Sequence, residues 1–182
     1  MVQHATENLI SVKVDVDKKG GSDLFSTFNG RSMPTLLFLD GSGKEIDRII
    51  GYLPPEQYQT RVVEIQENIN TLGACLQKYE NGERTSHLLF TMAQKYTDRN
   101  ESDNAKKYYA ELLESFPGLN ENIAAKARFE LAYNEFKIGR VNSFNDFINN
   151  FSTSPMSQMA LSYMARFYKG EDEQVSEFVV NS

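Results

Sequence analysis

The sequence predicts an α/β part followed by an all-α part, and three observations support this division. Short runs of β-branched and apolar residues come before position 68, whereas long segments with helical periodicity follow position 82. The stretch Asn68–Gly82 marks the change in composition. A chain of 182 residues is long enough for two small domains, each with its own core. We therefore expect one domain over residues 1–70 and a second over residues 71–182.

The first predicted element is a strand over Leu9–Val16. Its apolar residues Ile10, Val12 and Val14 alternate with polar ones, which is the period-two pattern of a half-buried strand. Gly20 and Gly21 follow this segment and are expected to end the strand. Ser22 then has the side chain of a helix N-cap, and the sequence predicts a short helix from there to Gly30.

A β-hairpin and a further helix follow. Thr35–Leu39 is a continuous apolar run, as expected for a strand buried on both faces. The turn sequence of residues 40–43 leads into a second strand over residues 44–50. Two prolines at 54 and 55 open a helix. On this helix apolar side chains repeat at helical spacing, at Tyr58, Val62, Ile65 and Ile69.

This β-α-β-β-α order, with the stretches "SVKVDVD", "MPTLLFLDGSGKEI" and "IIGYLPPEQY", resembles the C-terminal half of a thioredoxin-like domain over about residues 2–69. The resemblance implies a cis proline at Pro34, which turns the Met33 backbone outward so that an extended peptide can pair with it. It also places Gly51 and Tyr52 in the same groove. The substrate-binding set that it implies is Met33, Pro34, Thr35, Gly51 and Tyr52. The alternative is a trans Pro34 that serves only as a turn residue.

The sequence departs from this family where the redox chemistry would lie. A complete thioredoxin domain has a Cys-x-x-Cys pair before this region, but the chain has one cysteine, Cys75, which does not match the family's position. Dithiol–disulfide exchange needs an attacking and a resolving thiol. Without the family's central strand, the strands at Leu9–Val16 and Met33–Leu39 would each have an open edge. We expect this part to be remodelled, partly disordered, or completed by a second copy.

The C-terminal half has a repeating helical pattern that resembles tetratricopeptide repeats. Ala93 recurs as Ala132 and Ala165, at intervals of 39 and 33 residues. The second unit is degenerate, since Val141–Phe151 has phenylalanines where an alanine is expected. A terminal helix is predicted near Glu171–Val180. The alternative is an all-helical cap without true repeats.

Repeats of this kind bind peptides on a concave surface formed by their first helices. The resemblance places six residues on that surface: His87, Phe90, Gln94, Phe129, Tyr133 and Phe136. Aromatic residues at this spacing also occur in helix cores. The sequence leaves the two alternatives open.

Composition disfavours several classes of function. Net charge is −6, and the positive charges are scattered, so nucleic-acid binding is disfavoured. No apolar run approaches the roughly 20 residues of a membrane span. One cysteine and two distant histidines predict no metal site, and no phosphate loop or nucleophile motif predicts a cofactor or an enzyme activity. We expect Cys75 to be a small buried residue.

Two functional hypotheses remain. The first is a truncated thioredoxin-like protein whose intact parent is a thiol–disulfide oxidoreductase, with this chain retaining peptide or protein binding. The second is a non-catalytic interaction scaffold made of a thioredoxin remnant and helical repeats. Both predict a protein or peptide partner, and open strand edges allow a homodimer. The compartment stays open, although many proteins of this layout are bacterial and exported.

Overall fold

The computed structural model describes residues 9–169, and these form two compact units. The first unit comprises residues up to 84 together with Gln94–Glu101, and the second comprises Thr85–Ala93 and the residues from 102 onward. The predicted boundary at residue 70 differs from this division. The helix after residue 70 and the end of the following helix both belong with the α/β part.

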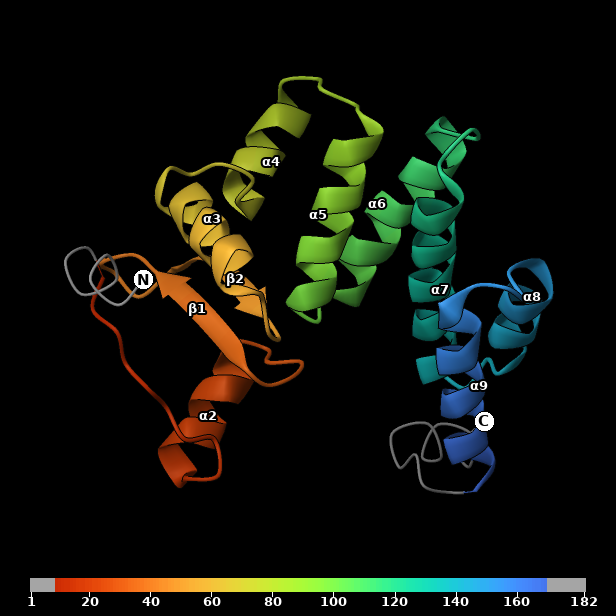
Figure 1. The fold of residues 1–182 in the computed structure, drawn as a ribbon, viewed down its shortest axis with the longest axis horizontal. Coiled ribbons are helices and arrows are strands. Elements are labelled where there is room, and N and C mark those ends of the chain that lie inside the picture. The colour runs from red at the N-terminus through yellow and green to blue at the C-terminus, as the bar shows by residue number, and fades with distance from the viewer. Residues whose placement is uncertain (1–8, 170–182) are drawn as a thin grey trace. The chain divides into compact units, whose positions relative to one another are not determined.

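The first unit contains a two-stranded sheet with helices around it (Figure 1). In chain order its elements are α2 (Lys19–Thr27), β1 (Thr35–Leu39), β2 (Glu45–Ile50), α3 (Pro55–Gln66) and α4 (Leu72–Glu80). The C-terminal part of α5 (Ser86–Asp98) completes it. A small core of Phe38, Ile49, Val62 and Ile65 joins the sheet to α3.

The hairpin forms as the sequence predicts, and its turn has a clear local cause. β1 and β2 are antiparallel, with Thr35 opposite Ile50 and Phe38 opposite Asp47. The Asp40 carboxylate accepts hydrogen bonds from the Ser42 and Lys44 backbone amides at 2.8 and 3.0 Å. The Ser42 hydroxyl also donates to this carboxylate, at 2.6 Å, and it is the main cause, ahead of the two backbone hydrogen bonds, of the lowered pKa of Asp40. Gly43 takes a φ of +84°, which a side chain would disfavour.

The predicted strand at Leu9–Val16 is wrong. These residues have no regular secondary structure, and Ile10 and Val12 are 97% and 77% exposed. A strand forms only when its main chain has a partner, and no described residue pairs with this one. The fold of this part is therefore α-β-β-α, where the sequence predicted β-α-β-β-α. Helix α2 also begins at Lys19, three residues before the predicted cap Ser22.

The second unit is helical. It contains the N-terminal part of α5, then α6 (Ser102–Ser115), α7 (Glu121–Lys137), α8 (Asn142–Asn150) and α9 (Pro155–Tyr168). Helix α7 packs against α6, α8 and α9, so consecutive helices make hairpin-like contacts. Asn120 and Ser154 cap α7 and α9 through side-chain hydrogen bonds, and Pro155 occupies the first turn of α9. The predicted helix near Glu171–Val180 lies outside the described residues.

Candidate functional site

The structure brings together the two ends of the hairpin that the sequence singled out. Pro34 immediately precedes β1 and Gly51 immediately follows β2. The Gly51 N–H donates a hydrogen bond of 2.8 Å to the Pro34 carbonyl, so these two residues extend the ladder by one pair. The Met33–Pro34 peptide bond is cis, as the resemblance implied. Gly51 has a φ of +77°, a conformation that favours glycine.

We call Met33, Pro34, Thr35, Gly51 and Tyr52 the platform. Its two large side chains point into solvent: Met33 is 63% exposed and Tyr52 is 80% exposed. Thr35 is half-buried, and its hydroxyl donates to the Ser32 carbonyl at 2.5 Å. Solvent contact of this extent is costly for a thioether and an aromatic ring, and such side chains are the typical anchors of binding surfaces. The platform carries no carboxylate, imidazole or thiol, and its polar side-chain groups are the Thr35 hydroxyl and the Tyr52 phenol.

The main chain next to the platform forms an open sheet edge. Residues opposite one another in an antiparallel pair alternate between those that exchange hydrogen bonds and those that do not. Pro34 and Gly51 are a hydrogen-bonded pair, so the next hydrogen-bonded pair along the ladder is Leu36 with Ile49. The main-chain groups of Thr35 and Leu37 therefore face the other side of β1, where no strand lies among residues 9–169. We call Met33–Leu37 the open edge.

A buried charge cluster that the sequence analysis missed lies on β2. Asp47 has no solvent exposure, yet its carboxylate meets three cations. Its Oδ2 lies 2.5 Å from both Lys95 Nζ and Arg61 Nη2, and its Oδ1 lies 3.0 Å from Arg99 Nη2. These cations come from α3, α5 and the residue just after α5. Asp47 therefore ties β2 to both helical segments.

A second acid and a second arginine extend this cluster. Glu45 Oε1 lies 2.8 Å from Arg99 Nη2, and Arg48 Nη2 lies 2.5 Å from Glu45 Oε2. Arg48 also donates hydrogen bonds to the carbonyls of Phe28 and Asp98, at 2.8 and 3.0 Å. Asp98 is the last residue of α5, so this guanidinium satisfies a carbonyl at the negative end of the helix dipole.

The cluster has the electrostatics of a structural site. Burial alone would raise the pKa of Asp47, but the Lys95 charge and the hydrogen bonds from Lys95 and Arg99 outweigh it and lower that pKa. Burial lowers the pKa of Lys95, and Asp47 opposes this shift. Each charge thus depends on its partners to remain ionised. Every buried polar group here has a partner in the fold, so we assign the cluster a role in stability.

Cys75 lies on α4 and is buried, as predicted from the sequence. Burial raises the pKa of the Cys75 thiol above its ordinary value. The thiol therefore stays protonated at neutral pH, and a protonated, buried thiol is a poor nucleophile. Cys75 is a structural residue in this chain.

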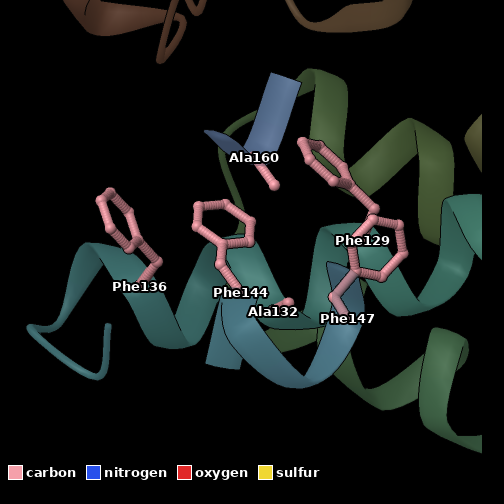
Figure 2. Packing of buried hydrophobic residues seen from close by; sticks show 6 residues of the cluster. All are labelled: Phe129, Ala132, Phe136, Phe144, Phe147 and Ala160. Atoms are coloured by element: carbon pink, nitrogen blue, oxygen red, sulfur yellow. The ribbon is translucent and has the colours of Figure 1, made fainter. Parts of the chain in front are cut away.

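The six residues predicted for a helical groove do not form one surface. Phe129 and Phe136 are 5% and 0% exposed, and they belong to an aromatic core with Ala132, Phe144, Phe147 and Ala160. Figure 2 shows the Phe129 and Phe147 rings side by side and Phe144 next to Ala160. This burial favours the core alternative for both phenylalanines. Side chains this buried cannot line a peptide-binding groove.

The remaining four residues have different environments. The half-buried Tyr133 ring lies 4.9 Å from that of Tyr163, measured between centroids. Phe90 packs edge-on against Tyr109 at 6.2 Å, and His87 is exposed. Gln94 belongs to the other compact unit.

Within residues 9–169 no three acids, histidines or cysteines gather in a way that could hold a metal ion. The described helices include none that is long and apolar enough to cross a membrane.

Comparison with known proteins supports the α/β assignment. Residues 4–66, about a third of the chain, match the family model of the thioredoxin-like domain. Searches of curated proteins and of solved structures gave no significant match. The match includes the whole platform, the hairpin and α3. The chain therefore contains a thioredoxin-like domain at residues 4–66, and a helical region follows it.

Proposed function

We propose that this chain binds an extended peptide or protein segment at the platform. The observation that carries the proposal is the exposure of Met33 and Tyr52 on either side of the Pro34–Gly51 hydrogen bond. The thioredoxin-like match supports it, because the platform lies inside the matched residues. With Cys75 buried as its one cysteine, the chain itself performs no dithiol exchange.

Main-chain pairing and side-chain contacts would act together in this binding. An extended peptide beside Met33 can form backbone hydrogen bonds, which give affinity for many sequences. Met33 and Tyr52 would then cover apolar side chains of the peptide, with the flexible thioether adapting its shape to different ones. This combination predicts preference for apolar, uncharged segments and broad rather than strict sequence selectivity.

Binding to an array of random decapeptides, followed by calorimetry on the strongest binder, tests the proposal. We expect Tyr52→Ala and Met33→Ala each to weaken binding roughly tenfold, because truncation of a central anchor removes about 1–2 kcal/mol. The helical unit offers matched controls, namely Tyr168→Ala and Met159→Ala, whose side chains are 70% and 48% exposed. Equal weakening by the control substitutions, or none by the platform substitutions, would contradict the proposal.

Two wider roles are consistent with peptide binding. In the first, the chain is part of a longer thiol–disulfide oxidoreductase, and the family match favours this role. In the second, it is a non-catalytic scaffold in which the helical region adds a further binding surface. Sequencing the DNA upstream of the Met1 codon separates them. An in-frame Cys-x-x-Cys segment, with insulin reduction by the longer protein, supports the first role, and an in-frame stop close upstream supports the second.

A further inference from the structure

The thioredoxin-like part carries two main-chain segments that lack a strand partner among residues 9–169. One is the open edge, Met33–Leu37, where Thr35 and Leu37 present their main-chain groups away from β2. The other is the segment Leu9–Val16, which we call the free segment because it has no strand partner among the described residues. Its first residue, Leu9, packs against the apolar core of its own copy and has to leave it before the whole segment can pair as a strand. Its exposed fractions are 97% at Ile10, 77% at Val12 and 43% at Val14. Each copy of the chain thus offers one strand acceptor and one apolar, alternating strand donor.

We propose that two copies of this chain exchange these segments, so that the free segment of each copy forms a strand on the open edge of the other. A donor and an acceptor on the same chain allow mutual exchange between two copies, and mutual exchange closes as a two-fold dimer, whereas one-way donation would continue from copy to copy. The exchange pairs both open edges and leaves neither exposed to further association.

The side-chain pattern fixes the register of this pairing. In an antiparallel ladder with Lys13 opposite Thr35, Ser11 lies opposite Leu37. Both pairs can then exchange main-chain hydrogen bonds, because Thr35 and Leu37 present their main-chain groups to this edge. Directly opposed residues point their side chains to the same face. Val12 then lies opposite Leu36 and Ile10 opposite Phe38. The exposed apolar residues of one copy thereby join the row that packs on Ile49, Val62 and Ile65 in the other.

Charge favours the antiparallel direction. In this register Asp15 lies opposite Met33, two residues along the chain from Arg31 of the partner copy, whose guanidinium donates to the Thr97 carbonyl at 3.4 Å within its own copy. A parallel arrangement would instead bring Asp15 toward Asp40 at the far end of β1, and Asp40 is held ionised by its hydrogen bonds from Ser42. Opposite charges next to one another stabilise a strand pair, whereas like charges destabilise it.

The inference goes beyond peptide binding at the platform, because it rests on residues 10–14 and on the edge of β1 rather than on Tyr52. Sedimentation velocity of the full chain over a hundredfold concentration range is the first measurement. We expect a dimer that dissociates on dilution. We expect Val12→Asp to weaken the dimer at least tenfold, because it places a charge against Leu36. Lys13→Ser changes the opposite face of the same segment and should leave the dimer intact.

A cross-linking experiment identifies the occupant of the edge. One preparation carries Lys13→Cys and a second carries Thr35→Cys. In the proposed register these two positions face each other across a bonded pair about 5.5 Å apart, within disulfide range. Mixing the preparations under mild oxidation should give a covalent dimer, whereas Ser11→Cys mixed with Thr35→Cys, two residues out of register, should give much less.

Three outcomes would overturn the exchange. The first is a chain that stays monomeric at all concentrations. The second is a Lys13→Cys/Thr35→Cys double variant that closes its disulfide within one monomer, because a copy's own segment would then occupy the edge. The third is a dimer that survives Val12→Asp with unchanged affinity. The open edge shares Met33, Pro34 and Thr35 with the platform, so a peptide and a second copy compete for the same main chain. Peptide binding is therefore measured on the dilute monomer and with Tyr52→Ala, whereas dimer formation is measured without peptide and with Val12→Asp, so failure of one proposal is distinguished from failure of the other.

Discussion

The two compact units differ in the charge that they bury. In the thioredoxin-like part the interior contains a fully buried aspartate with three cations around it. In the helical part the interior is an aromatic cluster in which Phe136 and Phe144 have no solvent exposure. The first arrangement depends on pH and on the presence of every charged partner, while the second depends on shape and volume.

The surfaces of the two units also differ, in how many large apolar side chains they expose. Thirteen large apolar side chains are exposed among the described residues, and nine of them lie between positions 10 and 69. They include Met33 and Tyr52 on the platform and Ile10, Val12 and Val14 in the free segment. The thioredoxin-like part thus buries a charge cluster beside a small apolar core, and it carries most of the exposed large apolar side chains. In the two proposals above, these exposed apolar groups serve contacts with other chains.

The largest expected effect comes from removing the buried anion. Asp47→Ala leaves Lys95, Arg61 and Arg99 without their common partner, and an uncompensated buried charge costs about 3–5 kcal/mol. Hydrogen exchange measured by mass spectrometry should show faster exchange over residues 35–66 and unchanged exchange over residues 121–160. Asp23→Ala, on the exposed surface of α2, is the control. An unchanged exchange pattern in Asp47→Ala would contradict the structural role of the cluster.

A loss of similar size is expected in the helical core. Phe144 is fully buried and its ring lies 4.7 Å from that of Phe136, between centroids. Phe144→Ala should destabilise the helical part by about 3–5 kcal/mol, because it removes a buried ring and leaves a cavity. Phe144→Leu, which fills more of the space, should cost less. Urea unfolding followed by exchange over residues 121–160 measures both, and equal losses would argue against tight packing around the ring.

Low pH should destabilise the charge cluster more than the aromatic core, without any mutation. The folded-state pKa of Asp47 lies below its unfolded value, so its contribution is fully present above about pH 4, the ordinary aspartate range. That contribution falls as the pH drops through the folded-state pKa. Lowering the pH from 7 to 3 should therefore reduce the thermal stability of residues 35–66 more than that of residues 121–160. Asp47→Asn should flatten this pH dependence, and a slope equal to that of the wild type would contradict the assignment.

A smaller effect is expected at the neutral hydrogen bonds of the α4 cap. Thr71 is buried and caps α4, with its hydroxyl oxygen accepting from the Ala74 N–H at 3.2 Å and donating to Asn68 Oδ1 at 2.5 Å. Thr71→Ala should cost about 1 kcal/mol in urea unfolding, because it removes the cap. Thr71→Ser keeps the hydroxyl and should recover most of that loss. No difference between alanine and serine would show that the cap contributes nothing.

The sequence predicts the elements whose causes are local. The β1–β2 hairpin follows from an apolar run and an Asp-Gly turn, and α3 follows from its prolines and helical periodicity. The segment Leu9–Val16 has an equally clear strand pattern, yet it forms no strand, because pairing depends on a partner that its own pattern does not supply. Alternation predicts which side of a segment is apolar. It does not predict what will cover that side.

The candidate site was predictable in part for the same reason. Pro34 and Gly51 were recognisable from their flanking motifs, and the hydrogen bond between them confirms that they meet. The Asp47–Lys95 pair is separated by 48 residues, and neither residue stands out among the chain's scattered charges. The Phe129 and Phe136 spacing suits a groove and a core equally well. Only the packing of α8 and α9 against α7 distinguishes them.

The most direct test of the central claim is an NMR titration of the full chain with the decapeptide that binds it most strongly. Peptide binding at the platform predicts that amide signals shift at Met33, Thr35, Leu37, Gly51 and Tyr52, while those of α7–α9 remain in place. Shifts confined to α7–α9, with the platform signals unchanged, would contradict it and assign peptide binding to the helical part.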